Sequence, residues 1–152
     1  MTKEQQQADS IGEWMQAQDR YANLLGIKLD EVKPGYSRAS LTVTGDMLNS
    51  VGITHGGVTF SLADFAFAVA ANSHGRVAVA LSAQINYPAA SREGDKLTAT
   101  AQEESLSGRT GLYTIEVRTT DDRLVGLFTG SVFRRSDNLS DWMNSNQEEA
   151  TP

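Results

Sequence analysis

The sequence predicts an α+β domain in which an antiparallel sheet wraps around one central buried helix. Between Val58 and Ala71 nearly every residue is Val, Phe, Leu or Ala, which is typical of a helix that is apolar on almost all sides and therefore buried. Two segments before this helix and four after it alternate apolar and polar residues, as strands do. The regular βαβα order that marks a parallel sheet is absent, so we expect antiparallel strands.

The first predicted element is an amphipathic helix over residues 10–25. Ser10 and Glu13 have the spacing of a capping box, and the apolar residues from Ile11 to Leu25 fall on one face. Gly26 can end this helix. We expect it to cover the rim of the core.

The predicted strands follow in chain order. Segments 27–32 and 39–43 surround Pro34-Gly35, which suits the central positions of a type II turn. After the central helix come 77–87, 97–101, 113–117 and 124–133. In the first of these, one face is apolar and the other, with Ser82 and Gln84, can line a polar site.

The chain is expected to form one domain over residues 1–135, since 152 residues suit a single core. Residues 136–152 are polar and acidic apart from Leu139, Trp142 and Met143. They are expected to be a tail that is disordered or only loosely docked.

Composition excludes several classes of protein. The absence of Cys rules out disulfides and thiolate chemistry, and two His are too few for a His-rich metal centre, so we expect no metal. A net charge of −6 argues against nucleic acid as a partner. The N-terminal residues lack a signal-peptide core and the apolar run is too short for a membrane span, so we expect a cytoplasmic protein without a membrane partner.

Asp64 is the unusual residue of the central helix. A buried carboxylate is costly unless it is paired, yet no Lys or Arg occurs between Ala39 and Gly75. Buried carboxylates with perturbed pKa values cluster at functional sites. An arginine distant in sequence could also pair with Asp64, so the residues alone leave both interpretations open.

The start of the central helix is a second candidate. Gly56-Gly57 allows close approach of the backbone and leaves first-turn N–H groups that can bind negative oxygen. Asn49 and His55 lie just upstream and could hold substrate or water. The alternative is structural: His55 as a cap or packing residue, and the glycines as a turn.

These residues resemble a known family. Asn49, His55-Gly56-Gly57 and Asp64 at this spacing, with Ser82 on the next strand, resemble the hotdog-fold acyl-CoA thioesterases of the PaaI type, associated with phenylacetate breakdown. The resemblance runs from about residue 24 to residue 134. It implies a hotdog fold, in which a sheet wraps a central helix.

The resemblance also implies roles for these residues. Asp64 would be nucleophile or general base, and the Gly56 N–H would polarise the thioester carbonyl. Asn49 would position the water or the carboxylate. His55 would support the oxyanion turn, and Ser82 would help hold the attacking water.

An oxyanion donor and one carboxylate suffice for thioester hydrolysis, because a thiolate leaves readily. No cofactor is then needed, and CoA belongs to the substrate. Arg92, Lys96, Arg109, Arg134 and Arg135 are candidate contacts for its phosphates. The acyl group stays open: phenylacetyl or a similar arylacetyl group follows from the resemblance only, and Phe60, Phe65, Phe67 and Tyr87 could line a pocket or pack in the core.

Two other functions remain open at this stage. One is an acyl-thioester dehydratase or hydratase, for which His55 would have to lie near the reacting carbons. The other is a non-catalytic acyl-CoA-binding module.

Distance predicts that the site is shared between chains. Gly56 and Asp64 are separated by eight positions of one helix, or roughly 12 Å at 1.5 Å per residue. A carbonyl oxygen and the attacking water are only about 3 Å apart. We therefore expect a two-fold homodimer that brings Gly56 of one chain beside Asp64 of the other. The resemblance implies that Asn49, His55 and Gly56 come from one chain and Asp64 and Ser82 from its partner. A dimer of such dimers is implied by the resemblance alone.

Overall fold

The computed structural model describes the backbone of residues 1–150 and the side chains of residues 1–145. The helices are α1 (Lys3–Gln18), α2 (Arg20–Leu25), the 3-10 turn η1 (Gly45–Met47), α3 (Gly56–Asn72) and α4 (Leu139–Ala150). The strands are β1 (Lys28–Lys33), β2 (Tyr36–Thr42), β3 (Arg76–Asn86), β4 (Lys96–Ser107), β5 (Thr110–Thr119) and β6 (Leu124–Asn138).

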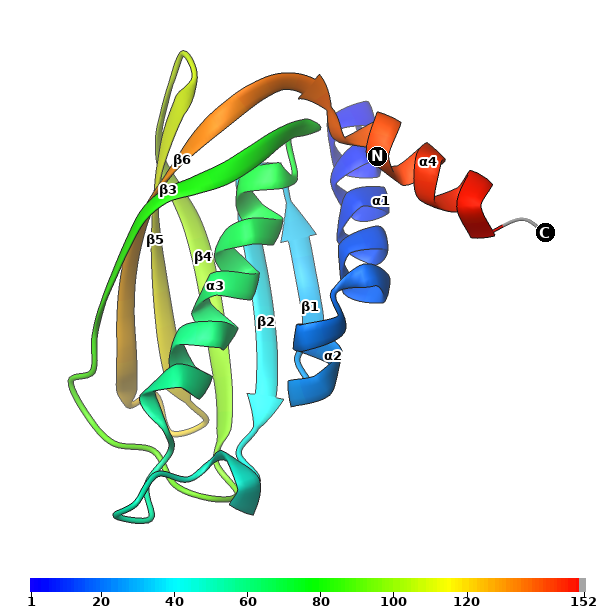
Figure 1. Ribbon diagram of the computed structural model, residues 1–152. Helices are drawn as coiled ribbons and strands as arrows, with labels where there is room; N and C mark the ends of the chain where they lie inside the picture. The colour runs from blue at the N-terminus through cyan, green and yellow to red at the C-terminus, as the bar shows by residue number, and fades with distance from the viewer. Residues whose placement is uncertain (151–152) are drawn as a thin grey trace.

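The six strands form one sheet in the order β1-β2-β4-β5-β6-β3, and all neighbouring strands are antiparallel. Figure 1 shows the sheet curving around α3, with α1 and α2 beside β1 and α4 projecting away from the sheet on the same side of the view as α1. The predicted fold, a sheet wrapped around a central helix, is confirmed. Within the described residues no helix is both long and apolar enough to cross a membrane.

Aromatic side chains pack α3 against the middle of the sheet. The ring of Phe67 on α3 lies 5.6 Å from that of Tyr113 on β5 and 5.4 Å from that of Phe128 on β6. Gly130 makes room for this contact, because a Cβ there would lie 2.7 Å from the Phe67 ring. Phe67 therefore belongs to the core, which was one of its two predicted roles.

The β1–β2 turn is confirmed as predicted. Gly35 has a φ of 74°, the left-handed value that the third position of a type II turn requires. The Gly35 N–H donates to Ser73 Oγ at 2.8 Å, so the turn is held by the C-terminal end of α3.

The single helix predicted over residues 10–25 differs from the structure in two ways. The helix begins earlier, at Lys3, and it is broken at Asp19 into α1 and α2. The helix begins at Lys3 because the Thr2 side chain, and not Ser10, caps it by accepting from the Gln5 N–H at 3.0 Å. Asp19 then leaves the helical conformation and caps α2 by accepting from the Ala22 N–H at 2.9 Å. Gly26, with a φ of 74°, ends α2 as predicted.

Strand β6 continues past the predicted domain end at residue 135, because Asn138 still pairs with Arg76. Helix α4 follows, so the segment expected to be disordered or only loosely docked is helical as far as Ala150. Leu139 is buried and its N–H donates to Gly75 O at 2.8 Å, while Trp142 Nε1 donates to Asp137. The apolar residue Leu139 thus packs the first turn of α4 against the rest of the chain. Residues 151–152 lie outside the described part.

Candidate active site

Asn49 organises the loop that leads into α3. Its side-chain oxygen accepts from the N–H groups of Val51 at 3.0 Å and Ile53 at 3.3 Å, and its own N–H donates to Ile53 O at 2.8 Å. The loop is therefore rigid without help from a ligand. The side-chain oxygen of Asn49 accepts hydrogen bonds from the loop backbone. The NH₂ of the same Asn49 amide is therefore the group that can donate to a substrate.

His55 is the N-cap of α3. Its Nδ1 accepts from the Gly57 N–H at 2.9 Å, and its carbonyl accepts from the Val58 N–H at 2.9 Å. Both of these first-turn donors are thus satisfied internally. Within the described residues the Gly56 N–H donates no hydrogen bond, so it is the donor that remains for a bound oxygen.

Tyr87, directly after β3, packs against Gly56 at the start of α3. Its hydroxyl donates to Gly56 O at 3.0 Å, and a Cβ on Gly56 would lie 3.2 Å from the Tyr87 ring. Sequence reasoning treated Tyr87 only as a pocket or core aromatic. The signal that could have found it is its position, directly after a strand and before Pro88.

Asn49, Gly56 and Tyr87 line one cavity of about 400 Å³. Thr59 of α3 and Ser91 of the β3–β4 connection also line it, and Ser91 Oγ donates to Thr54 Oγ1 at 2.7 Å. The first half of the predicted site is therefore assembled within one chain.

Asp64 is exposed in the single chain, which corrects the expectation that it is buried. The sheet covers only one side of α3, and Asp64 lies on the other. It lines a separate cavity of about 230 Å³ together with Asp19, Tyr21 and Phe60. Within the described residues of one chain its carboxylate forms no hydrogen bond or ion pair, and its nearest charged neighbour in the cavity is the like-charged Asp19.

The environment of Asp64 favours its protonated form. Partial burial beside apolar side chains raises the pKa of the Asp64 carboxyl above its usual range, and the like charge of Asp19 adds to the rise. A carboxylate with a raised pKa is a better proton acceptor once ionised, which suits a general base.

Ser82 is not brought to Asp64 within the chain. Ala83 pairs with Gly130, which faces Phe67 and α3, so the preceding Ser82 points to the opposite face of the sheet. There its hydroxyl shares a 2.7 Å hydrogen bond with Ser131 and lines a third cavity, of about 420 Å³. Its role with the attacking water stays a prediction.

The five candidate cations lie in two groups. Arg92 and Lys96 lie in and after the β3–β4 connection, next to Ser91 of the Gly56 cavity. Arg109, Arg134 and Arg135 lie at the opposite end of the sheet, where the Arg134 N–H donates to Arg109 O at 2.6 Å. Arg135 is paired with Asp137 at 2.9 Å.

A six-stranded antiparallel sheet wrapped around the single central helix α3 is the hotdog fold. Comparison with known proteins agrees, since residues 51–126 match the family described as the thioesterase superfamily. The chain belongs to this superfamily and is a PaaI-type hotdog thioesterase.

Two relatives illustrate the similarity, one of them both by its sequence and by its solved structure. The acyl-coenzyme A thioesterase PaaI of Escherichia coli is 42% identical over 79% of this chain and 86% of its own length. The solved E. coli PaaI protein from the phenylacetic acid degradation operon superposes with a TM-score of 0.86 at 38% identity, covering 88% of this chain and 97% of that one. A variant of the phenylacetic acid degradation protein PaaI from Thermus thermophilus gives a TM-score of 0.73 at 41% identity, covering 76% of this chain and 98% of that one.

Proposed function

We propose that this enzyme hydrolyses acyl-CoA thioesters to the free acid and CoA. The observation that carries the proposal is the pair of unused groups on α3: the Gly56 N–H beside Asn49, and the carboxylate of Asp64. The first supplies an oxyanion donor and the second a proton acceptor. The acyl-CoA substrate is supported by the name of the E. coli relative.

In the proposed step the thioester oxygen accepts a hydrogen bond from the Gly56 N–H. Water attacks the carbonyl carbon as Asp64 takes its proton, and the C–S bond then breaks to release CoA thiolate, which regains a proton. If Asp64 attacks instead, a mixed anhydride forms and water cleaves it. Single-turnover hydrolysis in isotopically labelled water tests the nucleophilic role: if water cleaves the anhydride at the Asp64 carbon, the label enters Asp64 and the product acid stays unlabelled. Direct attack by water on the thioester always places the label in the acid and none in Asp64.

The two halves of the site come from different chains in this proposal. Gly56 and Asp64 line different cavities of one chain, as the length of α3 requires. A two-fold dimer with antiparallel α3 helices would join one chain's Asn49 and Gly56 to the partner's Asp64. The proposal includes the pairing of dimers into a tetramer, which the resemblance alone implies, and a cytoplasmic location, which was expected from the N-terminal residues and the short apolar run.

The free edge of β3 supports such a dimer. β3 ends the sheet, and along it Leu81 is 61% exposed and Val79 is 41% exposed. An unpaired strand edge with exposed apolar side chains is a surface that another chain can cover. The same exposure explains why the apolar face expected for this strand is not buried within one chain.

The dehydratase alternative loses support because His55 Nδ1 is used as the helix cap.

The direct test is to incubate the protein with a panel of acyl-CoAs, arylacetyl thioesters included, and measure thiol release. Release from at least one, abolished by Asp64→Asn, supports the proposal. Binding without thiol release would indicate a binding module, and loss of an enoyl double bond with the thioester intact would indicate a hydratase.

A further inference from the structure

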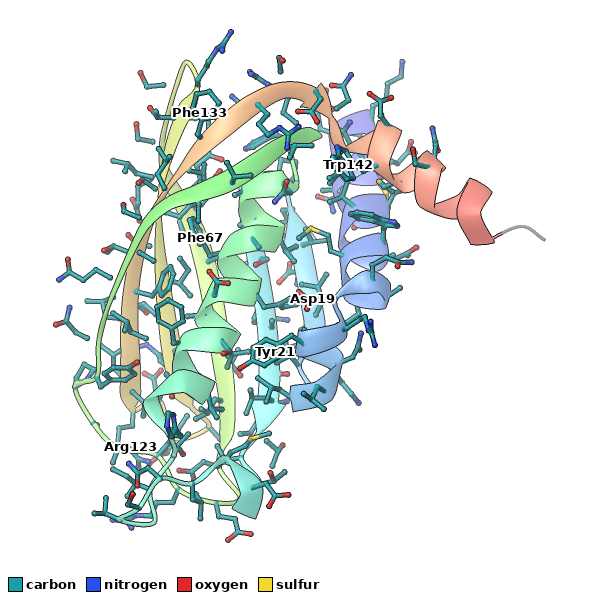
Figure 2. All side chains as sticks on the ribbon, in the orientation of Figure 1. Asp19, Tyr21, Phe67, Arg123, Phe133 and Trp142 are labelled. Atoms are coloured by element: carbon teal, nitrogen blue, oxygen red, sulfur yellow. The ribbon has the colours of Figure 1, made fainter. Side chains whose placement is uncertain are left out.

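The corner between α1 and α2 reaches the cavity that holds Asp64. Asp19, Tyr21 and Ala22 from this corner line the cavity, and Phe60 and Phe65 of α3 line its other side. Figure 2 shows Asp19 and Tyr21 between α2 and α3. This corner precedes the segment that carries the resemblance to thioesterases, so it was expected only to cover the rim of the core.

Tyr21 is tied to the first turns of α3. Its hydroxyl lies 3.1 Å from Ser61 Oγ, and Ser61 Oγ donates to Gly57 O at 2.6 Å. Since a serine hydroxyl has a single proton, which Gly57 O accepts, Tyr21 must be the donor to Ser61. The tyrosine ring is thereby held across one side of the cavity.

The Tyr21 side chain is only partly covered by the chain itself. It is 57% exposed, although it is fixed by a hydrogen bond at its tip. The cavity it borders is small, about 230 Å³, and its other lining side chains, apart from the carboxylates and Ser61, are apolar: Ala22, Ile27, Phe60, Phe65 and Ala68. An apolar chamber beside the reacting group is suited to the acyl part of a substrate.

We infer that Tyr21 is a specificity-determining residue, whose ring closes the acyl end of the cavity beside Asp64 and limits the length of the acyl chain accepted. This inference rests on the proposed thioesterase function. Asp19 and Asp64 in the same cavity also make it unfavourable for an acyl group that ends in a carboxylate. The chemical class selected is a short or compact, uncharged acyl group.

The test compares kcat/KM for straight-chain acyl-CoAs, from acetyl to palmitoyl, in wild type, Tyr21→Ala, Tyr21→Phe and Tyr21→Trp. Removing the ring should move the optimum to longer chains, and the ratio of long-chain to short-chain kcat/KM should rise about tenfold or more, the scale of fitting one methylene. Tyr21→Trp should move the optimum to shorter chains. Tyr21→Phe keeps the ring but loses the hydrogen bond to Ser61 that holds it, so its profile should lie between those of wild type and Tyr21→Ala.

Leu24→Ala is the matched control, because Leu24 lies on the same helix and is 79% exposed but does not line the cavity. Its profile should equal that of wild type. The inference is overturned if wild type releases thiol, Asp64→Asn does not, and the Tyr21→Ala and Tyr21→Trp profiles are unchanged. No thiol release by wild type from any acyl-CoA would instead refute the proposed function itself.

Discussion

Asp64 is the residue on which the proposed chemistry depends. Its carboxylate has no partner within the described residues and its pKa is raised by partial burial and by Asp19. Asp64→Asn removes the proton acceptor but keeps the size of the side chain. We expect turnover to fall by about 10²- to 10⁴-fold, the usual contribution of a general base. Thiol release within a few-fold of wild type would contradict this role.

The raised pKa of Asp64 predicts that wild type and Asp64→Asn differ in stability by an amount that depends on pH. The pKa of Asp64 is raised in the folded state, so Asp64 binds a proton more readily there than in the unfolded state, where the pKa of Asp is about 3.9. Ionisation of Asp64 therefore destabilises the fold as pH rises through the window between the two values. Asp64→Asn should melt at a higher temperature than wild type at neutral pH, and the difference should vanish at pH below the unfolded value. An equal difference at both pH values would contradict the pKa shift.

Arg92 is the candidate for the CoA phosphates that lies directly after Ser91 of the Gly56 cavity. Arg92→Ala should raise KM for an acyl-CoA several-fold and make it less sensitive to salt, because a charge contact is lost. Hydrolysis of the matching acyl-pantetheine, which lacks the nucleotide, should not change. Lys28→Ala, an exposed charge on β1, is the control. Equal effects on both substrates would exclude a phosphate contact.

At the scale of the elements, the packing of α3 on the sheet depends on small residues of β6. Gly130→Ala would place a methyl group 2.7 Å from the Phe67 ring, so the helix or the strand must shift. We expect a loss of about 1 to 3 kcal/mol in the free energy of unfolding, the usual cost of overpacking. Denaturant titration measures it.

Thr129→Ala, an exposed change one residue earlier on the outer face, should alter stability by less than about 0.5 kcal/mol. If both substitutions cost the same, Gly130 is not a packing requirement.

The elements that could be predicted from sequence are those with a strong local signal. The apolar run from Val58 to Ala71 marked α3, and Pro34-Gly35 marked the type of the β1–β2 turn. The start of α1 was missed because Thr2 precedes a polar stretch without apolar periodicity. The docking of Leu139 was missed because its partner, Gly75 O, lies far away in the sequence.

At the scale of the whole molecule, the proposed site is divided within one chain, since Gly56 and Asp64 line different cavities. The sequence identified Asp64 and Gly56 because a lone charge in an apolar run and a paired glycine are visible locally. The hydrogen bonds of Tyr21 to Ser61 and of Tyr87 to Gly56 were not predicted, since they span 40 and 31 residues of chain. Ser82 was placed on the site by resemblance, whereas its strand turns it to the opposite face of the sheet.

The shared active site is the central claim, and subunit complementation tests it most directly. Asp64→Ala and Asn49→Ala chains, each inactive alone, are mixed in equal amounts under conditions that exchange subunits. Half of the randomly formed dimers are hybrids, and in each hybrid one site carries both lesions while the other carries none. The account predicts recovery of roughly a quarter of wild-type thiol release. If mass measurement confirms hybrid dimers and no activity returns, each site is built within a single chain and the account is wrong.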